Sequence, residues 1–299
     1  MITEKQRELR RNFIGSSDCA TILGLNPWAN VGDLWLEKTG RAVPDETSAA
    51  AETGNRLEAV LIEYAAEQLG IGVEKIEFPQ TIIHSSGLLC ANLDGQVMEF
   101  SEGAAIVECK FTGLGEEWGE EPTDVPARVA AQCLFQMGVC GPRYKIAYVP
   151  VALANFNRLS FKLYQVPRDD EAANGILETC MDWMRRYVKA DVRPPDSVPS
   201  LDVLKRVRRQ PSKVVKVASD LLDRYEAAKE VAKKAKEDTE AAQAALVAAL
   251  ADAEGGETDD GRKFTYLMRH RCSYMVQESD FRQLAVLKTK KENPCLQQL

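Results

Sequence analysis

The residues in this chain whose types and spacing are best suited to chemistry are two carboxylates and a lysine. Asp94 stands fourteen positions before Glu108, and Lys110 follows Glu108 after one intervening residue. Carboxylate and main-chain carbonyl oxygens are the ligands that Mg²⁺ and Mn²⁺ prefer. A nearby lysine can hold a water molecule or stabilise developing negative charge. The three side chains therefore indicate metal-dependent phosphodiester hydrolysis, although an exposed Asp-Gly turn and a surface Glu/Lys pair would give the same pattern.

The flanking sequence predicts strands that would position these side chains. Residues 103–110 form an apolar run that ends in Glu108, and alternation along a strand places Glu108 and Lys110 on one face and Cys109 on the other. Residues 88–100 predict a strand, a tight turn or bulge at Asp94-Gly95, and a second strand. We expect this meander to bring Asp94 beside Glu108.

Two predicted helices add polar side chains to the same region. Residues 54–58 open a helix that continues to Gly70, which places Glu58 in its first turn, where the helix dipole favours an anion. After an acidic loop over residues 116–126, a second helix carries Gln132 and Gln136 among apolar neighbours. An inward-facing glutamine could orient a substrate or water, although a solvent-facing glutamine is the commoner case.

A series of short motifs surrounds these residues and resembles a known family. The motifs are Arg10 with Ile14-Gly15-Ser16-Ser17-Asp18, Ile22-Leu23-Gly24-Leu25-Asn26-Pro27-Trp28, Leu34-Trp35-Leu36-Glu37-Lys38-Thr39-Gly40, Gly54-x-x-Leu57-Glu58, Leu93-Asp94-Gly95, Glu108-Cys109-Lys110, Glu117-Trp118-Gly119-Glu120 and Ala131-Gln132-x-x-x-Gln136-Met137. In their order and spacing they resemble the phage lambda exonuclease and YqaJ viral recombinase family, a branch of the PD-(D/E)XK nucleases, over roughly residues 8 to 190.

This resemblance implies an α/β fold, with a restriction-endonuclease-like core in which helices flank a mixed central β-sheet. It also implies a role for each candidate residue. Lys110 would activate the attacking water and Gln132 would support the site. The implied ligands of the divalent metals are Asp94, Glu108, Glu58 and the main-chain carbonyl of Cys109.

The resemblance further implies a pocket for a terminal 5′-phosphate, formed by Arg10 and Ser17, with Arg11 as a rival for the role of Arg10. Ser17 also has a physical reason to be there, because backbone N–H groups at the start of the helix that follows are available to an anion. The alternative interpretation of Ser17 is an ordinary helix N-cap, and both interpretations can hold together.

The activity that the resemblance implies is a Mg²⁺-dependent 5′-to-3′ exonuclease on linear double-stranded DNA, with Mn²⁺ as an alternative ion and two ions at each site. It would leave 3′ single strands for a strand-annealing protein, and relatives form trimeric rings around DNA. A structure-specific or restriction-type endonuclease on the same core is the alternative. A non-catalytic DNA-binding or scaffold component that acts through the C-terminal arm is a further one.

Composition excludes some other classes of site. Eight cysteines are scattered without a C-x-x-C pair and only two histidines are present, which leaves little material for a zinc or iron–sulfur centre. Neither a signal-like N-terminus nor an apolar stretch of about 18 residues is found, so we expect no membrane association and a cytoplasmic location. The family resemblance implies the cytoplasm of a bacterial host and a phage or prophage origin. The net charge is −7, but basic residues cluster at 205–213, either as a phosphate contact or as a solvated linker.

The chain changes character after the region of resemblance. We predict a nuclease core over residues 1–193, a proline-rich and basic linker over 194–212, and an accessory module over 213–299. The module would hold a long helix from about Lys213 to Ala253, a small β-hairpin from residues 263–268 and 272–276, and a helix that begins near Ser279. It would guide DNA, dock a partner, or form a coiled arm that stabilises the core or an oligomer.

Overall fold

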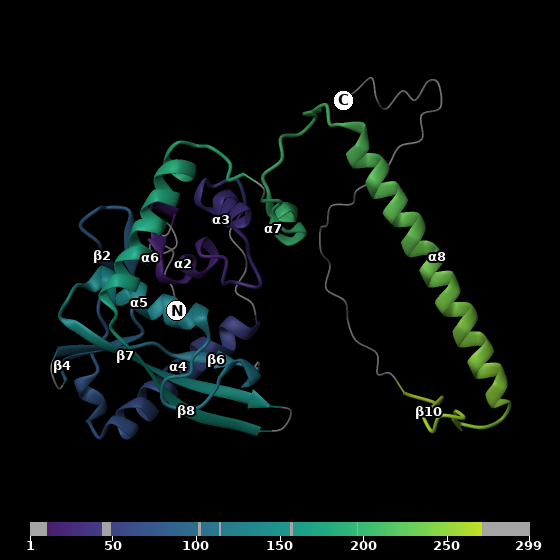
Figure 1. Cartoon of the computed structure of the whole chain (residues 1–299), viewed down its shortest axis with the longest axis horizontal. Coiled ribbons are helices and arrows are strands. Elements are labelled where there is room, and N and C mark those ends of the chain that lie inside the picture. The colour runs from purple at the N-terminus through teal and green to yellow at the C-terminus, as the bar shows by residue number, and fades with distance from the viewer. Residues whose placement is uncertain are drawn as a thin grey trace. The chain divides into compact units, whose positions relative to one another are not determined.

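The computed structural model describes residues 11–43, 49–100, 103–113, 115–155, 158–195 and 197–270. The chain divides into two compact units at Arg209/Gln210 (Figure 1). The first unit contains both sheets that surround the predicted site, and the second contains a long helix and a small hairpin. In the described part of the chain, every helix is too short or too polar to cross a membrane.

A five-stranded mixed sheet lies at the centre of the first unit. Its strands are β4 (Gly95–Phe100), β5 (Gly103–Val107), β6 (Lys110–Thr112), β7 (Tyr144–Asn155) and β8 (Arg158–Pro167). Their order is β4-β5-β7-β6, with β8 antiparallel to β7 along its other edge. Strand β5 pairs in parallel with the first half of β7 and β6 with the second half, so both lie on the same edge of that long strand.

A second, three-stranded sheet precedes the central one in the chain. It is formed by β1 (Ile14–Gly15), β2 (Ile82–Ile83) and β3 (Leu89–Ala91), in the order β1-β3-β2. The predicted meander over residues 88–100 is therefore wrong in one respect, because β3 and β4 belong to different sheets. Residues 92–94 connect them, and the hairpin that places Asp94 near Glu108 is β4–β5, in which Gly95 pairs with Val107.

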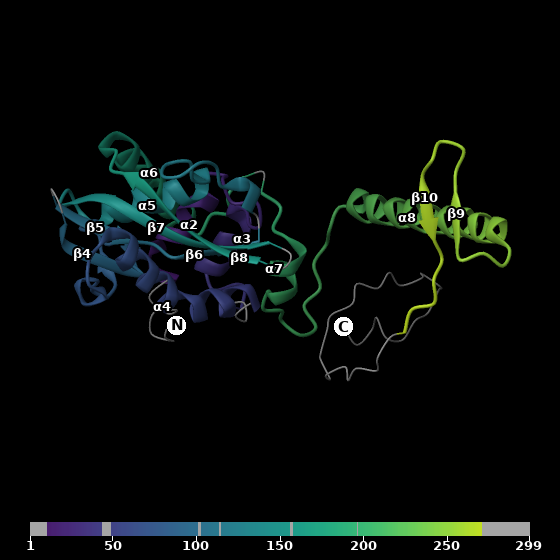
Figure 2. The ribbon, with the colours of Figure 1, turned by 90° about the horizontal axis from the view of Figure 1, so that it is seen from below.

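Helices cover both faces of the central sheet (Figure 2), which confirms the predicted mixed sheet flanked by helices. Side chains alternate along a strand, and β5 shows the consequence. Ala104 and Ile106 join the larger core, while Ala105 and Val107 join a smaller core on the opposite face. The helices of the larger core are α2 (Ser16–Ile22), α3 (Val31–Lys38), α5 (Ala127–Cys140) and α6 (Asp170–Trp183), and that of the smaller core is α4 (Ala49–Leu69).

Local sequence explains where several of these helices begin and end. Asn30 accepts hydrogen bonds from the backbone of Gly32 and Asp33 at the start of α3, and Asp169 caps α6 by accepting from Ala172. Helix α5 ends at Gly141, whose φ of 97° lies in the left-handed region that glycine tolerates. Helix α5, which carries Gln132 and Gln136, therefore has a defined C-terminal end.

The C-terminal end of α5 is also held by a buried cation. The Nη1 atom of Arg168, which follows β8, donates to the carbonyl oxygens of Met137, Gly141 and Tyr144 at 2.7, 3.0 and 3.2 Å. Its side chain is only 9% exposed. A positive charge at this position satisfies terminal carbonyls and interacts favourably with the helix dipole.

Replacing Arg168 with alanine is therefore expected to lower the free energy of unfolding by about 2–4 kcal/mol, because buried carbonyls lose their donors. Urea unfolding measures the change. The matched control is Arg186→Ala, since Arg186 forms an exposed pair with Asp182 and should cost less than about 1 kcal/mol. Equal losses in the two variants would contradict the capping role of Arg168.

Residues 197–209 pack on the first unit, which differs from the predicted linker over 194–212. Ser200 caps the short helix α7 (Leu201–Arg206), in which Val203 is buried. Val207 pairs with Ala42 in an isolated antiparallel bridge, and the backbone of Arg208 donates to the carbonyl of Arg41. The apolar residues among the basic ones, Val203, Leu204 and Val207, join the larger core.

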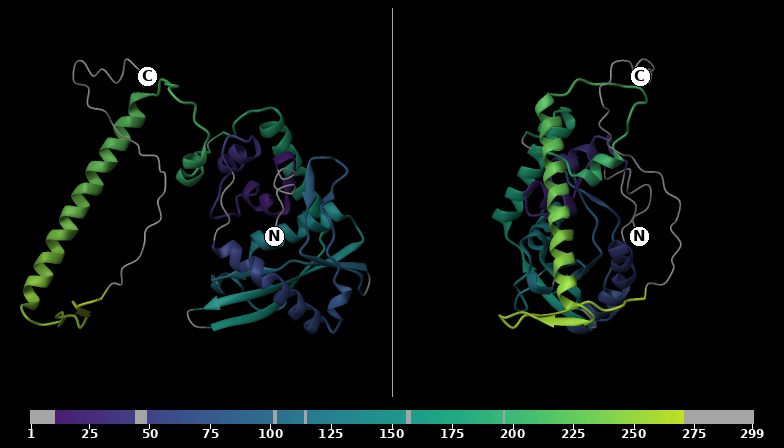
Figure 3. Two further views of the ribbon diagram at one scale, coloured as in Figure 1. Left: turned by 180° about the vertical axis from the view of Figure 1, so that it is seen from behind. Right: turned by 90° about the vertical axis from the view of Figure 1, so that its right-hand side faces the viewer.

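The second unit contains α8 (Ser219–Leu250) and an antiparallel pair, β9 (Gly255–Glu257) with β10 (Lys263–Thr265), at the end of that helix (Figure 3). The long helix was predicted, but the partner of residues 263–265 was not. Gly255 and Gly256, which follow the helix, form part of β9, where Phe264 packs close to Gly256. The predicted strand over residues 272–276 and the helix near Ser279 lie outside the described residues.

Candidate active site

The site lies where one strand along the edge of β7 ends and the next begins. Strand β5 ends at Val107 and β6 begins at Lys110, so Glu108 and Cys109 form the break between them. The backbone of Glu108 still donates to the carbonyl of Tyr148 at 2.9 Å. Alternation then directs the Glu108 side chain to the α5 face, like Ala104 and Ile106 before it.

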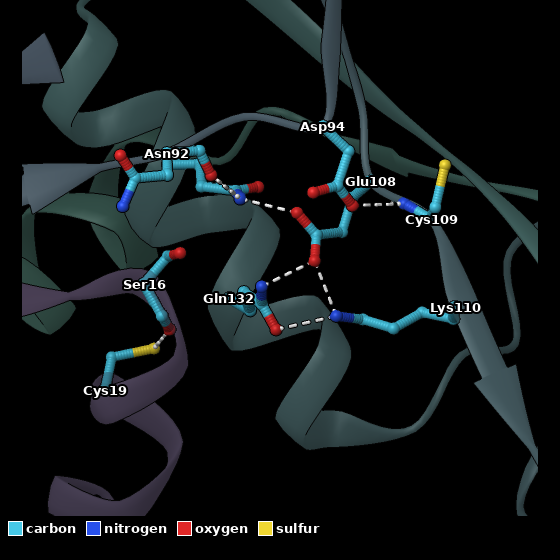
Figure 4. A network of polar contacts seen from close by, with 9 residues as sticks. Ser16, Cys19, Asn92, Asp94, Glu108, Cys109, Lys110 and Gln132 are labelled. Atoms are coloured by element: carbon cyan, nitrogen blue, oxygen red, sulfur yellow. Dashed lines mark hydrogen bonds and ion pairs between the residues drawn. The ribbon is translucent and has the colours of Figure 1, made fainter. Parts of the chain in front are cut away.

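Glu108 is buried, with three side-chain nitrogen donors on its carboxylate (Figure 4). Oε1 accepts from Lys110 Nζ at 2.5 Å and from Gln132 Nε2 at 2.6 Å. Oε2 accepts from Gln136 Nε2 at 2.6 Å. Lys110 also donates to Gln132 Oε1 at 3.0 Å, which closes a ring of contacts between Glu108, Lys110 and Gln132. Glu108 and Lys110 thus point to the same side of the sheet, as predicted.

Asp94 lies beside this network and points towards Glu108 (Figure 4). Its Oδ2 atom accepts from the backbone N–H of Cys109 at 2.8 Å. Burial and the nearby Glu108 carboxylate raise the pKa of Asp94 from 3.8 to about 8, and Lys110 offsets part of this effect. Two carboxylates thus share a poorly solvated position with only one cationic side chain between them, which is an arrangement that favours a bound cation.

In the metal-free protein, the raised pKa of Asp94 predicts a stability effect with a definite sign. The protonated form of Asp94 is favoured in the folded state, so its contribution is fully present below the unfolded pKa of about 4 and is lost as pH rises through about 8. Replacing Asp94 with asparagine, which keeps an acceptor for Cys109, should stabilise the metal-free protein by up to about 3 kcal/mol at pH 9 and little near pH 4.

Thermal unfolding in EDTA between pH 4 and 9 measures this difference, and a gain of 1 kcal/mol corresponds to a rise of about 2–4 °C. Asp182→Asn, on the exposed surface of α6, is the control and should change the unfolding temperature little at any pH. An Asp94→Asn variant that is less stable than the wild type at pH 9 would exclude this electrostatic account.

Lys110 remains charged in this environment. Desolvation is the largest single effect and lowers the pKa of Lys110, but the Glu108 carboxylate at 2.5 Å and the nearby Asp94 together outweigh it, and the pKa is raised. A protonated lysine donates hydrogen bonds and has no acceptor. Lys110 can therefore hold a water or a phosphate oxygen and offset negative charge, which is a different role from that of a general base.

Glu58 occupies a different position from the one predicted. Helix α4 begins at Ala49, because the residues before Gly54 favour a helix and one glycine inside it costs only about 1 kcal/mol. Glu58 is consequently far from the first turn, and the argument from the helix dipole is wrong. Its backbone carbonyl faces the Cys109 thiol at 3.9 Å, and its charge is a minor cause of the raised pKa of Asp94.

The remaining donors fit a divalent cation held by oxygen atoms. Among the described residues, no group of three or more His, Cys, Asp and Glu side chains is close enough to hold a metal, so the carboxylates brought together are those of Asp94 and Glu108. Oδ1 of Asp94 has no hydrogen-bond donor in the described part of the chain. These two carboxylates with the Cys109 carbonyl are hard oxygen donors of the kind that Mg²⁺ and Mn²⁺ prefer.

A cavity of about 250 Å³ adjoins the network, and Lys110 and Gln132 form part of its wall. Ser17 from α2 lines the same cavity, together with Trp28 and Arg128, whose guanidinium lies 5.0 Å from the Trp28 ring centroid. The structure therefore places Ser17 on the path to the predicted site.

Of the residues predicted for the 5′-phosphate pocket, Arg11 and Ser17 line different cavities. Arg10 lies outside the described residues, and Arg11 lines a separate cavity with Lys38 and Arg41. Ser17 is not the N-cap of α2, because Gly15 occupies that position and donates its N–H to Asp18 Oδ2 at 2.8 Å. Gly15 has no side chain that could cap the helix, and the Asp18 carboxylate accepts the N–H of Gly15 instead.

Gln136 belongs to the site, although the sequence interpretation assigned a role to Gln132 alone. Its side chain is fully buried, and Nε2 reaches both Glu108 and, at 3.4 Å, the carbonyl of Asn92. Its Oε1 atom is buried without a hydrogen-bond partner in the described part of the chain. The spacing of four residues from Gln132, which places both on one face of α5, was the available signal.

Comparison with known proteins finds a match for this region. Residues 6–143, just under half of the chain, match the family model described as the YqaJ-like viral recombinase domain. This part of the chain is similar to that domain. Asp94, Glu108, Lys110, Gln132 and Gln136 all fall within the matched residues.

The YqaJ-like domain has relatives in sequence and in structure. The chain is 31% identical over 190 residues to the uncharacterized protein YqaJ of Bacillus subtilis (strain 168), a match over 62% of this chain and 56% of that protein. The chain thus spans just over half the length of this relative. Among solved structures, LHK-Exo with dAMP aligns at 17% identity and a TM-score of 0.48, over 63% of this chain and 94% of that one. A phage-related exonuclease from Haemophilus somnus 129PT aligns at 14% and 0.46, over 62% and 97%.

Proposed function

We propose that this protein is a divalent-metal-dependent exonuclease that degrades the 5′-ended strand of linear double-stranded DNA. The observation that carries the proposal is the convergence of Asp94, Glu108 and Lys110 beside an accessible cavity, inside a YqaJ-like domain. LHK-Exo, one of the proteins that the chain resembles, is an alkaline exonuclease from Laribacter hongkongensis. The released 3′ single strand would suit a strand-annealing partner in phage-type recombination.

The residues of the site have separate tasks in this reaction. Asp94, Glu108 and the Cys109 carbonyl would hold Mg²⁺ or Mn²⁺, and we propose two ions at each site. Bound there, the cation would offset charge on the scissile phosphate and favour ionisation of the attacking water. Gln132 and Gln136 hold the Glu108 carboxylate in one orientation. Lys110 donates from the cavity wall to the attacking water or to a phosphate oxygen.

Direction would come from the DNA end. Ser17, with Arg10, is proposed to bind the terminal 5′-phosphate, because the Ser17 side chain is exposed in the same cavity as Lys110. Fixing the terminal phosphate determines which phosphodiester reaches the carboxylates. A trimeric ring and a location in the host cytoplasm remain parts of the proposal that follow from the family resemblance.

The test compares three substrates in Mg²⁺: linear duplex with 5′-phosphates, the same duplex without them, and closed circular duplex. We expect mononucleotide release from the linear substrates, faster with the 5′-phosphate, and an intact circle. Asp94→Ala is the inactive control. Nicking or linearisation of the circle would favour an endonuclease on the same core, and full activity of Asp94→Ala would refute the assigned site.

A further inference from the structure

A second cavity, of about 550 Å³, lies in the first unit and shares no lining residue with the first. Its wall comes from the residues before β1, from the end of α3 and from the π-helix η3 (Met184–Lys189). Four of the lining side chains are basic, in a protein whose net charge is −7. They are Arg11, Lys38, Arg41 and Lys189.

The charges in this wall are unequally compensated. Lys38 forms an ion pair with Asp18 at 2.5 Å, so its charge is used inside the fold. Arg41 pairs with Asp191 at 2.8 Å. Arg11 and Lys189 have no carboxylate partner among the described residues, and both are exposed. Lys38 is already neutralised by Asp18. The remaining lining charges are those of Arg11, Arg41, Lys189 and Asp191, which sum to +2.

Arg41 is held in place before any ligand arrives. Its guanidinium lies 4.4 Å from the Trp35 ring centroid, and Trp35 Nε1 donates to the carbonyl of Tyr187 in η3. The Arg41–Asp191 pair is bidentate, because Nη1 and Nη2 donate to the two carboxylate oxygens at 2.8 and 2.9 Å. Both side chains are largely exposed, 40% and 62% accessible, so the pair contributes little energy and a phosphate can compete with Asp191 for this edge of the guanidinium.

Two further features are consistent with a binding role. The π-helix that presents Lys189 is a rare conformation that occurs frequently at functional sites. The basic segment that the sequence left open as a phosphate contact or a solvated linker packs against Arg41, because Arg208 donates its N–H to the Arg41 carbonyl. The backbone of Arg208 therefore lies beside a residue of the cavity wall.

We propose that this cavity, with Arg11, Arg41 and Lys189 in its wall, binds the backbone phosphates of the nucleic-acid strand. The two cavities are separated by the first turn of α2, since Ser17 lines one and its neighbour Asp18 pairs with Lys38 in the other. A strand that enters the active site can extend past this turn. The assignment rests on the proposed function for its ligand, but it concerns binding and needs no cleavage.

The test uses the full-length protein in EDTA, with a fluorescently labelled duplex and a labelled single strand whose binding is followed by anisotropy. The double variant Arg11→Gln/Lys189→Gln is compared with Lys75→Gln/Arg186→Gln, which removes the same charge from other exposed positions of the first unit. We expect the first pair to bind about tenfold more weakly at about 0.1 M salt. The slope of log Kd against log salt should fall by up to about 1.8, or 0.9 for each lost contact.

Identical affinities and slopes in the two double variants would overturn the proposal. So would a double variant with unchanged DNA binding that has lost binding of inorganic phosphate or a mononucleotide, since the cavity would then be a site for a free phosphate. Mg²⁺-dependent cleavage by the wild type is recorded in parallel. If the wild type cleaves DNA and the variants do not change DNA binding, this inference alone is refuted. If binding is salt-sensitive but no cleavage occurs, the proposed function alone is refuted.

Discussion

Replacing Glu108 with glutamine is expected to reduce Mg²⁺-dependent cleavage of linear DNA by about a thousandfold. The side chain keeps its size, but one of its oxygens becomes an amide that donates. Lys110, Gln132 and Gln136 all direct N–H groups at the carboxylate of Glu108. The amide NH₂ of the glutamine would therefore face another donor in either orientation. The variant therefore loses both a carboxylate ligand and the order of the network around it.

Single-turnover release of mononucleotides measures this loss, and the metal-dependent rise in unfolding temperature gives a second readout. That rise should disappear in Glu108→Gln, since the cation loses one of its two carboxylates. Glu178→Gln, on the exposed face of α6, is the matched control and should keep both properties. A Glu108→Gln variant with more than about a tenth of the wild-type rate would contradict the assignment of Glu108 as a ligand.

Much of this site could be predicted from sequence because its parts are close along the chain. Glu108 and Lys110 are two residues apart, and alternation alone places them on one face. The β4–β5 hairpin then brings Asp94 near without any long-range information. Gln132 and Gln136 share a face of α5 by helical spacing, although which face turns inward depends on packing against the sheet.

The parts that the sequence missed depend on contacts between distant segments. The division of β3 and β4 between two sheets follows from the pairing of β3 with β1, more than seventy residues earlier. The start of α4 was misplaced because Gly54 resembles a boundary, yet it lies inside the helix. The basic residues at 205–209 were expected in a linker, and their position is fixed by Arg41 and Ala42, which no local pattern reveals.

Replacing Lys110 with methionine is expected to lower the cleavage rate by about a hundredfold to a thousandfold, with little change in the affinity for DNA. Methionine keeps most of the apolar stem but removes the charge that lies between Glu108 and the cavity. Lys145→Met, on the exposed part of β7, is the control and should leave the rate unchanged. Unfolding temperatures of both variants separate a loss of chemistry from a loss of folding.

The pH profile distinguishes two roles for Lys110. In the metal-free protein, Glu108 and Asp94 raise the pKa of this lysine above its ordinary value. A cationic role predicts that its charge contributes equally throughout pH 6–9. The ratio of wild-type to Lys110→Met rates should then be constant with pH. A lysine that acted as a general base would have to lose its proton first, and the ratio would rise with pH as the neutral form became populated. A rising ratio would therefore refute the cationic role and restore that of a base.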